Sequence, residues 1–152
     1  MYACGLRVGE AAPLKIDAII AAGQIIRVIG KGNKERHVPL PLPRLEELRK
    51  LWKTHKHPQW LFPNRAHDGP LERSVLMRTF ADAAQAAGLV GATSHSLRHS
   101  YAARLLEKRI DIRVVKILLG HATLATTDIY THLTEPTQAS LRRTLDELMT
   151  DL

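Results

Sequence analysis

A single stretch of the chain, residues 16–42, has the composition of β-strands, and the sequence that follows it is typical of helices. The stretch is rich in β-branched residues and is broken by glycines and by the turn-forming run KGNK at 31–34. This pattern predicts a small antiparallel sheet with strands near 17–21, 24–29 and 35–40, the last two joined by a hairpin with KGNK at its tip. Because strands and helices do not alternate along the chain, a parallel nucleotide-binding sheet is not expected.

Helical segments account for most of the remaining chain. Residues 2–12 are expected to be the end of a helix, which Pro13 prevents from continuing. The fold class expected is mainly α with a small antiparallel three-stranded sheet, that is, α+β. Further helices are expected at 42–57, 71–88, 95–109, 112–119, a short segment carrying Tyr130, and the C-terminal residues after Pro136.

Local signals mark the ends and the inward faces of these helices. Thr93 or Ser94 can cap the helix at 95–109. Asp111 can cap the next helix, which Gly120 ends. Apolar residues at helical spacing are expected to face inward. In the helices at 42–57 and 95–109 these residues are Leu45, Leu48, Leu51, Trp52, Leu97, Tyr101, Leu105 and Leu106.

The charge of the chain is positive and unevenly distributed. The net charge is +7 for 152 residues. Residues 1–60 contain 11 Lys or Arg and 5 Asp or Glu, whereas residues 61–152 contain 11 and 10. A basic half favours a polyanionic partner, nucleic acid first, although a solvated basic surface would have the same composition.

Cysteine content and hydropathy limit the other possibilities. A single cysteine, Cys4, excludes an internal disulfide and a thiolate zinc site, and it favours a reducing, cytoplasmic location. No apolar run approaches the ~20 residues that a membrane span requires.

Several polar residues could act on a substrate, but each has a structural alternative. Arg7 can form a salt bridge with Glu10, three residues on. Lys31 can be a surface lysine in a turn. His95 and Arg98 share one face of a helix start and can form a solvated face.

Zinc and P-loop sites are not expected. A zincin helix carries Glu directly after its first His, and here Ser96 follows His95. The GKGNK sequence lacks the GxxxxGK[ST] pattern and the strand-to-helix context of a P-loop.

Together, the candidate residues form a complete set for phosphodiester chemistry without a metal. Fixed cations stabilise the charge that grows on the non-bridging oxygens. A tyrosine phenol, with a pKa of ~10, needs a cationic environment and a proton acceptor before it can attack. A lysine can protonate the leaving alkoxide. The candidates are Arg7, Lys31, His95, Arg98, His121 and Tyr130.

Three sequence blocks, in this order, resemble the catalytic domain of tyrosine recombinases, the phage integrase and Xer-like site-specific recombinases. They are GLRVGE at 5–10, VIGKGNKERHVPLP at 28–41 and SHSLRHSYAARLLEKRIDIRVVKILLGHATLATTDIYTHL at 94–133. The resemblance extends from Cys4 to about Leu133, and the last block is close to diagnostic.

The resemblance implies a role for each candidate residue. Arg7 and Arg98 would clamp the scissile phosphate, and His121 would support it. Lys31 would protonate the leaving 5′-hydroxyl. His95 would handle the proton of the tyrosine. The nucleophile would be Tyr130, which would hold the DNA through a 3′-phosphotyrosine until a 5′-hydroxyl rejoins the strand.

The resemblance also implies a domain organisation and a set of partners. Residues 1–152 would be a single C-terminal catalytic domain, a fragment without the N-terminal DNA-binding domain and the start of the catalytic domain. The expected partners are double-stranded DNA and other recombinase protomers, in a synaptic tetramer for full-length members. No cofactor, metal or membrane is expected. In such proteins a C-terminal helix docks in a neighbouring protomer, but the stripe Leu141, Leu145, Leu148 and Leu152 could equally pack on its own domain.

Other functions remain open at this point. The chain could be a non-catalytic DNA-binding remnant of a truncated recombinase, or a helical regulator whose basic half is incidental. A type IB topoisomerase shares the chemistry, but the HSLRH and LLGHATLATTDIYTH sequences favour integrases.

Overall fold

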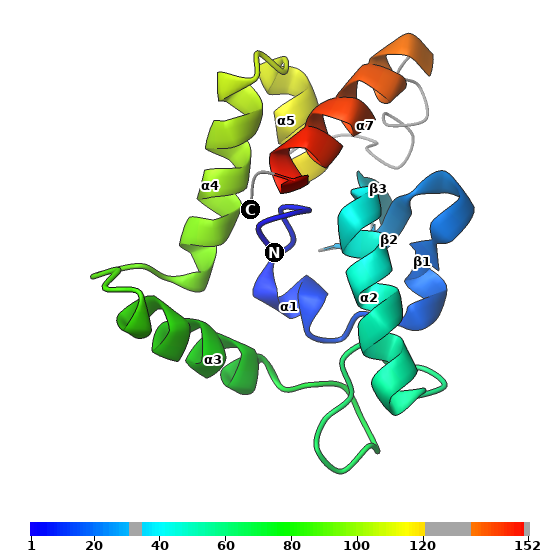
Figure 1. The fold of residues 1–152 in the computed structure, drawn as a ribbon, viewed down its shortest axis with the longest axis vertical. Helices are drawn as coiled ribbons and strands as arrows, with labels where there is room; N and C mark the ends of the chain where they lie inside the picture. Colours follow the sequence, from blue (N-terminus) through cyan, green and yellow to red (C-terminus); the bar gives the residue numbers. More distant parts are fainter. Residues whose placement is uncertain (31–34, 121–134, 151–152) are drawn as a thin grey trace.

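The structure is a computed structural model that describes residues 1–30, 35–120 and 135–150, and Figure 1 shows how its elements are arranged. The expected fold class is confirmed: helices predominate, and a single three-stranded antiparallel sheet is formed in the described chain. The helices are α1 (Val8–Ala11), α2 (Leu42–His55), α3 (Arg73–Ala86), α4 (Ser94–Glu107), α5 (Ile112–Leu119) and α7 (Glu135–Thr150). The strands are β1 (Ile19–Ile20), β2 (Ile25–Ile29) and β3 (Glu35–Pro39), and the 3-10 turns are η1 (Ile16–Ala18) and η2 (Ala21–Gly23).

The sheet has the strand order β1-β2-β3, and both pairings are antiparallel. The expected strands are confirmed, although β1 is shorter than expected because 3-10 turns flank it on both sides. The register pairs Ile26 with Val38 and Val28 with Arg36, and all four side chains are buried. One face of the sheet is therefore apolar except for a single arginine.

Two clusters of buried side chains form the core. One joins the N-terminal segment and the sheet to Leu45 of α2, and the other joins α4 and α5 to α7. Local signals had marked the ends of α5 correctly. The carboxylate of Asp111 accepts a hydrogen bond from the backbone N–H of Arg113 at 2.6 Å, and Gly120 ends the helix with a φ of 68°.

The expectation of a helix at residues 2–12 is wrong for the first part of this segment. Only Val8–Ala11 are helical, and the residues before them form a turn and an extended link. Gly5 has a φ of +58°, and a Cβ atom there would lie 2.6 Å from Cδ1 of Tyr101. The close approach of Tyr101, which is distant in sequence, therefore accompanies a backbone conformation that interrupts a helix.

Some of the residues expected to face inward are exposed. Leu106 is 44% exposed, because it lies about 100° around α4 from the buried Leu105. Trp52 lies on the same face of α2 as Leu45, but two turns beyond it, and its indole N–H donates to the carbonyl of His57 at 3.1 Å. Leu51, in the same last turns of α2, is also exposed.

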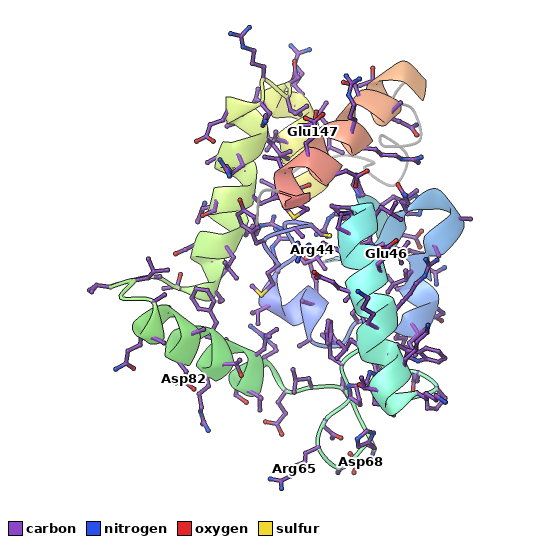
Figure 2. All side chains as sticks on the ribbon, viewed as in Figure 1. Arg44, Glu46, Arg65, Asp68, Asp82 and Glu147 are labelled. Carbon is purple, nitrogen blue, oxygen red and sulfur yellow. The ribbon has the colours of Figure 1, made fainter. Side chains whose placement is uncertain are left out.

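The C-terminal helix α7 packs on its own domain. Leu141, Leu145 and Leu148 are each at most 2% exposed, in one cluster with residues of α4 and α5. Arg44 of α2, labelled in Figure 2, donates to the carbonyl of Met149 at 3.0 Å. The described stripe therefore forms part of the core, while Leu152 and the expected short helix at Tyr130 lie outside the described residues. None of the helices in the described ranges is long and apolar enough to cross a membrane.

Candidate active site

Arg98 is an arginine buried inside the fold. Thr93 begins α4 as its N-cap, and its backbone N–H donates to Oγ of Ser96 at 3.0 Å. Arg98, in the second turn of the helix, is only 7% exposed. Its Nη1 donates to the carbonyl of Gly5 and its Nη2 to the carbonyl of Leu119. The guanidinium thus joins the segment before α1 to the end of α5.

Arg7 lies two residues after the carbonyl that Arg98 binds. Its Nη1 donates to Oε1 of Glu10 at 3.1 Å, and its backbone N–H donates to Oε2 of the same carboxylate at 2.8 Å. The Arg7 side chain is 40% exposed, whereas that of Glu10 is 8% exposed. The expected salt bridge is formed, and the Arg7 guanidinium still has a surface that a ligand can reach.

Arg36 is a third arginine at this place, and the sequence analysis missed it. Its Nη1 and Nη2 donate to the two oxygens of Glu10 at 2.9 and 2.8 Å, and its Nε donates to the carbonyl of Leu118 at 3.3 Å. A sequence signal was present, because alternation along β3 puts Arg36 on the same face as the buried Val38. An arginine on the apolar face of a strand calls for a partner inside the protein.

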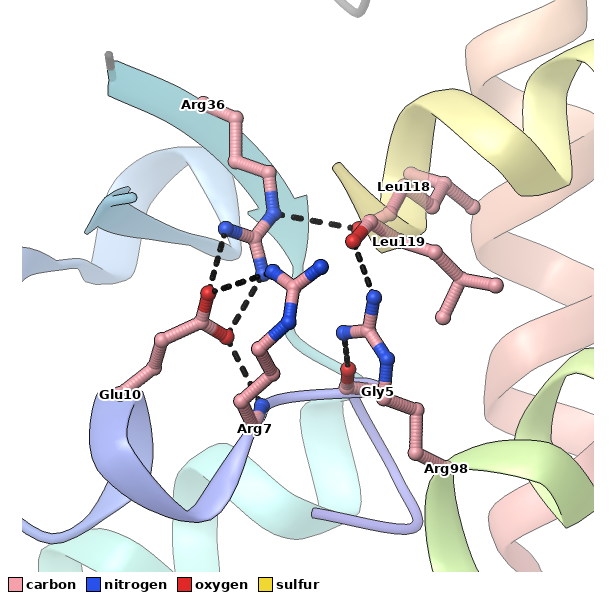
Figure 3. A network of polar contacts seen from close by, with 7 residues as sticks. All are labelled: Gly5, Arg7, Glu10, Arg36, Arg98, Leu118 and Leu119. Carbon is pink, nitrogen blue, oxygen red and sulfur yellow. Dashed lines mark hydrogen bonds and ion pairs between the residues drawn. The ribbon is translucent and has the colours of Figure 1, made fainter. Parts of the chain in front are cut away.

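Figure 3 shows these groups together, and we refer to Arg7, Glu10, Arg36 and Arg98 as the arginine network. The four residues come from the start of α1, from β3 and from α4. Two guanidinium groups, those of Arg7 and Arg36, bind the Glu10 carboxylate, and Arg98 adds a third cation, so the network has an excess of positive charge. Fixed cationic donors of this kind are suited to binding an oxyanion such as a phosphodiester.

The pKa values of the network follow from burial and from these contacts. Burial alone would raise the pKa of the Glu10 carboxyl, but hydrogen bonds from Arg36 and from Arg7 outweigh it and hold that pKa below 4.5. Burial, together with the positive charge of Arg7, lowers the pKa of Arg98 to about 10. At neutral pH, Glu10 is therefore a carboxylate and Arg98 remains a cation.

The structure brings together two of the six candidate residues, Arg7 and Arg98. His95 is exposed in the first turn of α4, three residues before Arg98. Lys31, His121 and Tyr130 lie outside the described residues. Within the described ranges, no group of three or more His, Cys, Asp or Glu side chains is placed to hold a metal ion.

Two of the described segments each end one position before a candidate residue that the structure does not describe. Residue 30 closes the segment that follows β2, one position before Lys31, and Gly120 is one position before His121. A Cβ atom at Gly120 would lie 3.2 Å from Cδ and Nε of Arg36. The arginine network therefore contacts one of these two segment ends directly.

Curated relatives of the chain are tyrosine recombinases. The chain is 41% identical over 141 residues to the tyrosine recombinase XerD of Lacticaseibacillus casei, covering 88% of this chain and 48% of that protein. It is 40% identical over 141 residues to XerD of Rhizobium meliloti (strain 1021), covering 89% and 45%. The chain thus spans about half the length of the curated relatives it matches.

Solved structures of recombinases have the same fold. The integrase of mycobacterium phage Brujita superposes with a TM-score of 0.74 and 29% identity, covering 95% of this chain and 47% of that one. The XerH recombinase bound to difH substrate superposes with a TM-score of 0.71 and 31% identity, covering 92% of this chain and 43% of that one. The catalytic core of lambda integrase superposes with a TM-score of 0.63 and 25% identity, covering 83% of this chain and 78% of that one.

A family model agrees with these likenesses. The model of the phage integrase family matches residues 1–136, which include the whole arginine network and all six candidate residues. The chain belongs to the phage integrase family, as a catalytic domain of the tyrosine recombinase type.

Proposed function

We propose that this chain cleaves and rejoins DNA strands in site-specific recombination, with Tyr130 as the nucleophile. The observation that carries the proposal is the convergence of Arg7 and Arg98, which are 91 residues apart in the sequence and lie in one arginine network. Relatives of the chain are tyrosine recombinases, and the related XerH recombinase is bound to a DNA substrate in its structure.

The described arginines can bind a phosphate without giving up their structural contacts. A guanidinium has five N–H donors. Arg98 donates one N–H to the carbonyl of Gly5 and one to the carbonyl of Leu119. Within the described part of the chain, these two contacts leave other N–H groups of the guanidinium for a phosphate. Arg7 is partly exposed and carries its charge at the same place. A scissile phosphate would thus meet donors that are already oriented.

The roles of the remaining residues are taken from their positions in the family motifs. The phenol oxygen of Tyr130 attacks the phosphorus while His95 takes the phenol proton. The bond from phosphorus to the 5′-oxygen breaks, and Lys31 supplies a proton to the leaving oxygen. His121 supports the phosphate. The products are a 3′-phosphotyrosine and a free 5′-hydroxyl, and attack by a 5′-hydroxyl on the phosphotyrosine reverses the step.

The alternative is a DNA-binding remnant that holds DNA but forms no covalent bond. It is kept because the chain spans about half the length of its relatives, so residues outside this sequence can be required for cleavage. Both functions predict binding that weakens steeply with salt, since phosphate contacts release counterions. Only the recombinase predicts a covalent product.

A trapping experiment separates the two functions. Duplexes that bind the protein are selected from a random-sequence library and rebuilt with a nick that lets the 5′-hydroxyl fragment diffuse away. Wild-type protein is expected to accumulate a covalent adduct that resists denaturation, and Tyr130→Phe is expected to form none, because the attacking oxygen is gone.

The matched control is Tyr2→Phe, which removes another phenol and keeps Tyr130. This variant is expected to form the adduct, and EDTA is expected to leave the yield unchanged. Tight binding without any adduct would favour the remnant. Adduct formation by Tyr130→Phe would show that another residue is the nucleophile.

A further inference from the structure

Arg36 uses every nitrogen of its guanidinium inside the protein. Both Nη atoms bind Glu10, and Nε binds the carbonyl of Leu118. The residue is 5% exposed, and each of its three nitrogens already has a partner in the protein. We therefore expect Arg36 to act through the groups that it holds.

The first of these groups is Glu10. Its Oε1 accepts from Nη1 of both Arg36 and Arg7, and its Oε2 accepts from Arg36 and from the Arg7 backbone. The fork of Arg36 fixes the plane of the carboxylate, because two parallel N–H groups meet two oxygens. The carboxylate in turn sets where the Arg7 guanidinium lies.

The second group is the end of α5. Arg36 binds the carbonyl of Leu118, and its Cδ and Nε lie so close to Gly120 that a Cβ atom there would be 3.2 Å away. Gly120 immediately precedes His121 in the sequence. Arg36 itself lies on β3, which begins at Glu35, four positions after Lys31 in the sequence.

We propose that Arg36 is a positioning residue, which holds Arg7 and the end of α5 in place for the strand-cleavage reaction. The proposal rests on the proposed function for its effect on cleavage, but not for its effect on Arg7. A lysine at this position would keep the charge and lose the planar fork, so it could not bind both oxygens of Glu10 and the Leu118 carbonyl together. Charge alone is therefore not expected to restore the role.

The first test measures the order of Arg7 directly. In protein with ¹⁵N-labelled arginine, relaxation of the Nε–H group of Arg7 is compared between wild type and Arg36→Lys. The group is expected to become more mobile in the variant. Arg27→Lys is the matched control, because Arg27 lies on the neighbouring strand and faces solvent. An unchanged order of Arg7 in a folded Arg36→Lys protein would overturn the proposal.

The second test measures cleavage, using the nicked duplex described above at saturating concentration. Adduct formation by Arg36→Lys is expected to slow by roughly 100-fold, as for a catalytic group displaced by about an ångström. DNA affinity is expected to stay within about threefold, because the charge is retained and buried. Arg27→Lys is expected to match the wild-type rate. An unchanged rate for Arg36→Lys would contradict the proposal.

The pH profile distinguishes positioning from a general loss of structure. Glu10 faces Arg7 on its own element, Arg36 on β3 and Arg98 on α4, while Arg73 of α3 packs against the neighbouring Gly9. Losing the Arg36 fork removes hydrogen bonds that lower the pKa of Glu10, while burial still raises that pKa. The acid limb of the rate profile is therefore expected to move to higher pH. A uniform loss at every pH would point to misfolding and count against positioning.

The two proposals can fail separately. If wild-type protein forms no adduct with any selected duplex, the proposed function fails, and the Arg7 relaxation still decides whether Arg36 positions Arg7. If wild type cleaves and Arg36→Lys leaves both the Arg7 order and the rate unchanged, the function stands and the positioning role is lost.

Discussion

The Glu10 side chain is 8% exposed, and its carboxylate carries the negative charge of the arginine network. It accepts hydrogen bonds from Arg7 and Arg36, and its negative charge lies close to Arg98 as well. Removing one member of a buried ion pair leaves the other charge uncompensated, which costs more than the pair itself contributes. The salt bridge between Arg7 and Glu10, expected from the sequence as a structural contact, is therefore also part of the arginine network.

Replacement of this carboxylate should destabilise the protein. We expect Glu10→Gln to lower the free energy of unfolding at neutral pH by about 3–5 kcal/mol, because Arg36 would remain buried without its counter-charge. Glu47→Gln is the control, since it breaks the more exposed ion pair with Arg44 and should cost about 0–1 kcal/mol. Urea denaturation measures both. Equal losses would show that burial of Glu10 has no energetic consequence.

The same variant carries a pH dependence with a defined sign. The folded pKa of Glu10 lies below its usual value of 4.5, so its stabilisation is fully present above that pH and is lost as the pH falls through the folded pKa. The stability difference between wild type and Glu10→Gln should therefore shrink in acid below pH 4.5. A difference that stays constant down to the acid unfolding transition would be inconsistent with this origin.

At the scale of elements, the segment before α1 depends on one glycine. Gly5 and Gly91 have similar backbone conformations, with φ of +58° and +74°, but they differ in surroundings. A Cβ atom at Gly5 would lie 2.6 Å from a ring carbon of Tyr101, whereas one at Gly91 would meet nothing within 4 Å. The pair therefore separates backbone strain from steric conflict.

We expect Gly91→Ala to cost about 1–2 kcal/mol, from the left-handed conformation alone. Gly5→Ala should cost about 1–3 kcal/mol more than Gly91→Ala, because the ring of Tyr101 cannot move without disturbing the core. Thermal and urea unfolding of the two variants give the comparison. If both variants lost the same stability, the contact with Tyr101 would be loose rather than tight.

Elements that depend on local signals were predictable, and those that depend on distant contacts were not. Asp111 and Gly120 act on their own helix, so the bounds of α5 followed from the sequence. The left-handed conformation at Gly5, which interrupts the helix expected before α1, accompanies a close contact with Tyr101, 96 residues away. Arg36 finds its partners at separations of 26 and 82 residues, which no local pattern reports.

For the whole molecule, α7 is the element that closes the core. Leu145 is 1% exposed and belongs to the cluster that α4, α5 and α7 share. We expect Leu145→Ala to lower the free energy of unfolding by about 2–5 kcal/mol through lost burial and a cavity. Leu106→Ala, at a residue that is 44% exposed, should stay within about 0.5 kcal/mol of wild type. A mild effect at Leu145 would mean that α7 rests on the domain without stabilising it.

The sequence predicted that Arg7 and Arg98 lie in one site, but it did not predict how they are arranged. The motifs identified Arg7 and Arg98 as partners, and the structure has both in the arginine network. The contacts of Arg98 could not be read from the sequence, because they are backbone carbonyls, which carry no side-chain signature. The catalytic roles of all six candidate residues, Arg7 and Arg98 included, stay predictions.

The last turn of α5 is held in an unusual way. A helix ends with carbonyls that lack partners within the helix, and such ends tend to fray. Here the carbonyls of Leu118 and Leu119 accept hydrogen bonds from Arg36 and Arg98, which come from other parts of the chain. Fraying of this turn would remove one hydrogen bond from each guanidinium and leave Arg36 bound to Glu10 and Arg98 bound to the Gly5 carbonyl. Opening of this helix end should therefore loosen the arginine network, and amide exchange in the last turn of α5 would measure that opening.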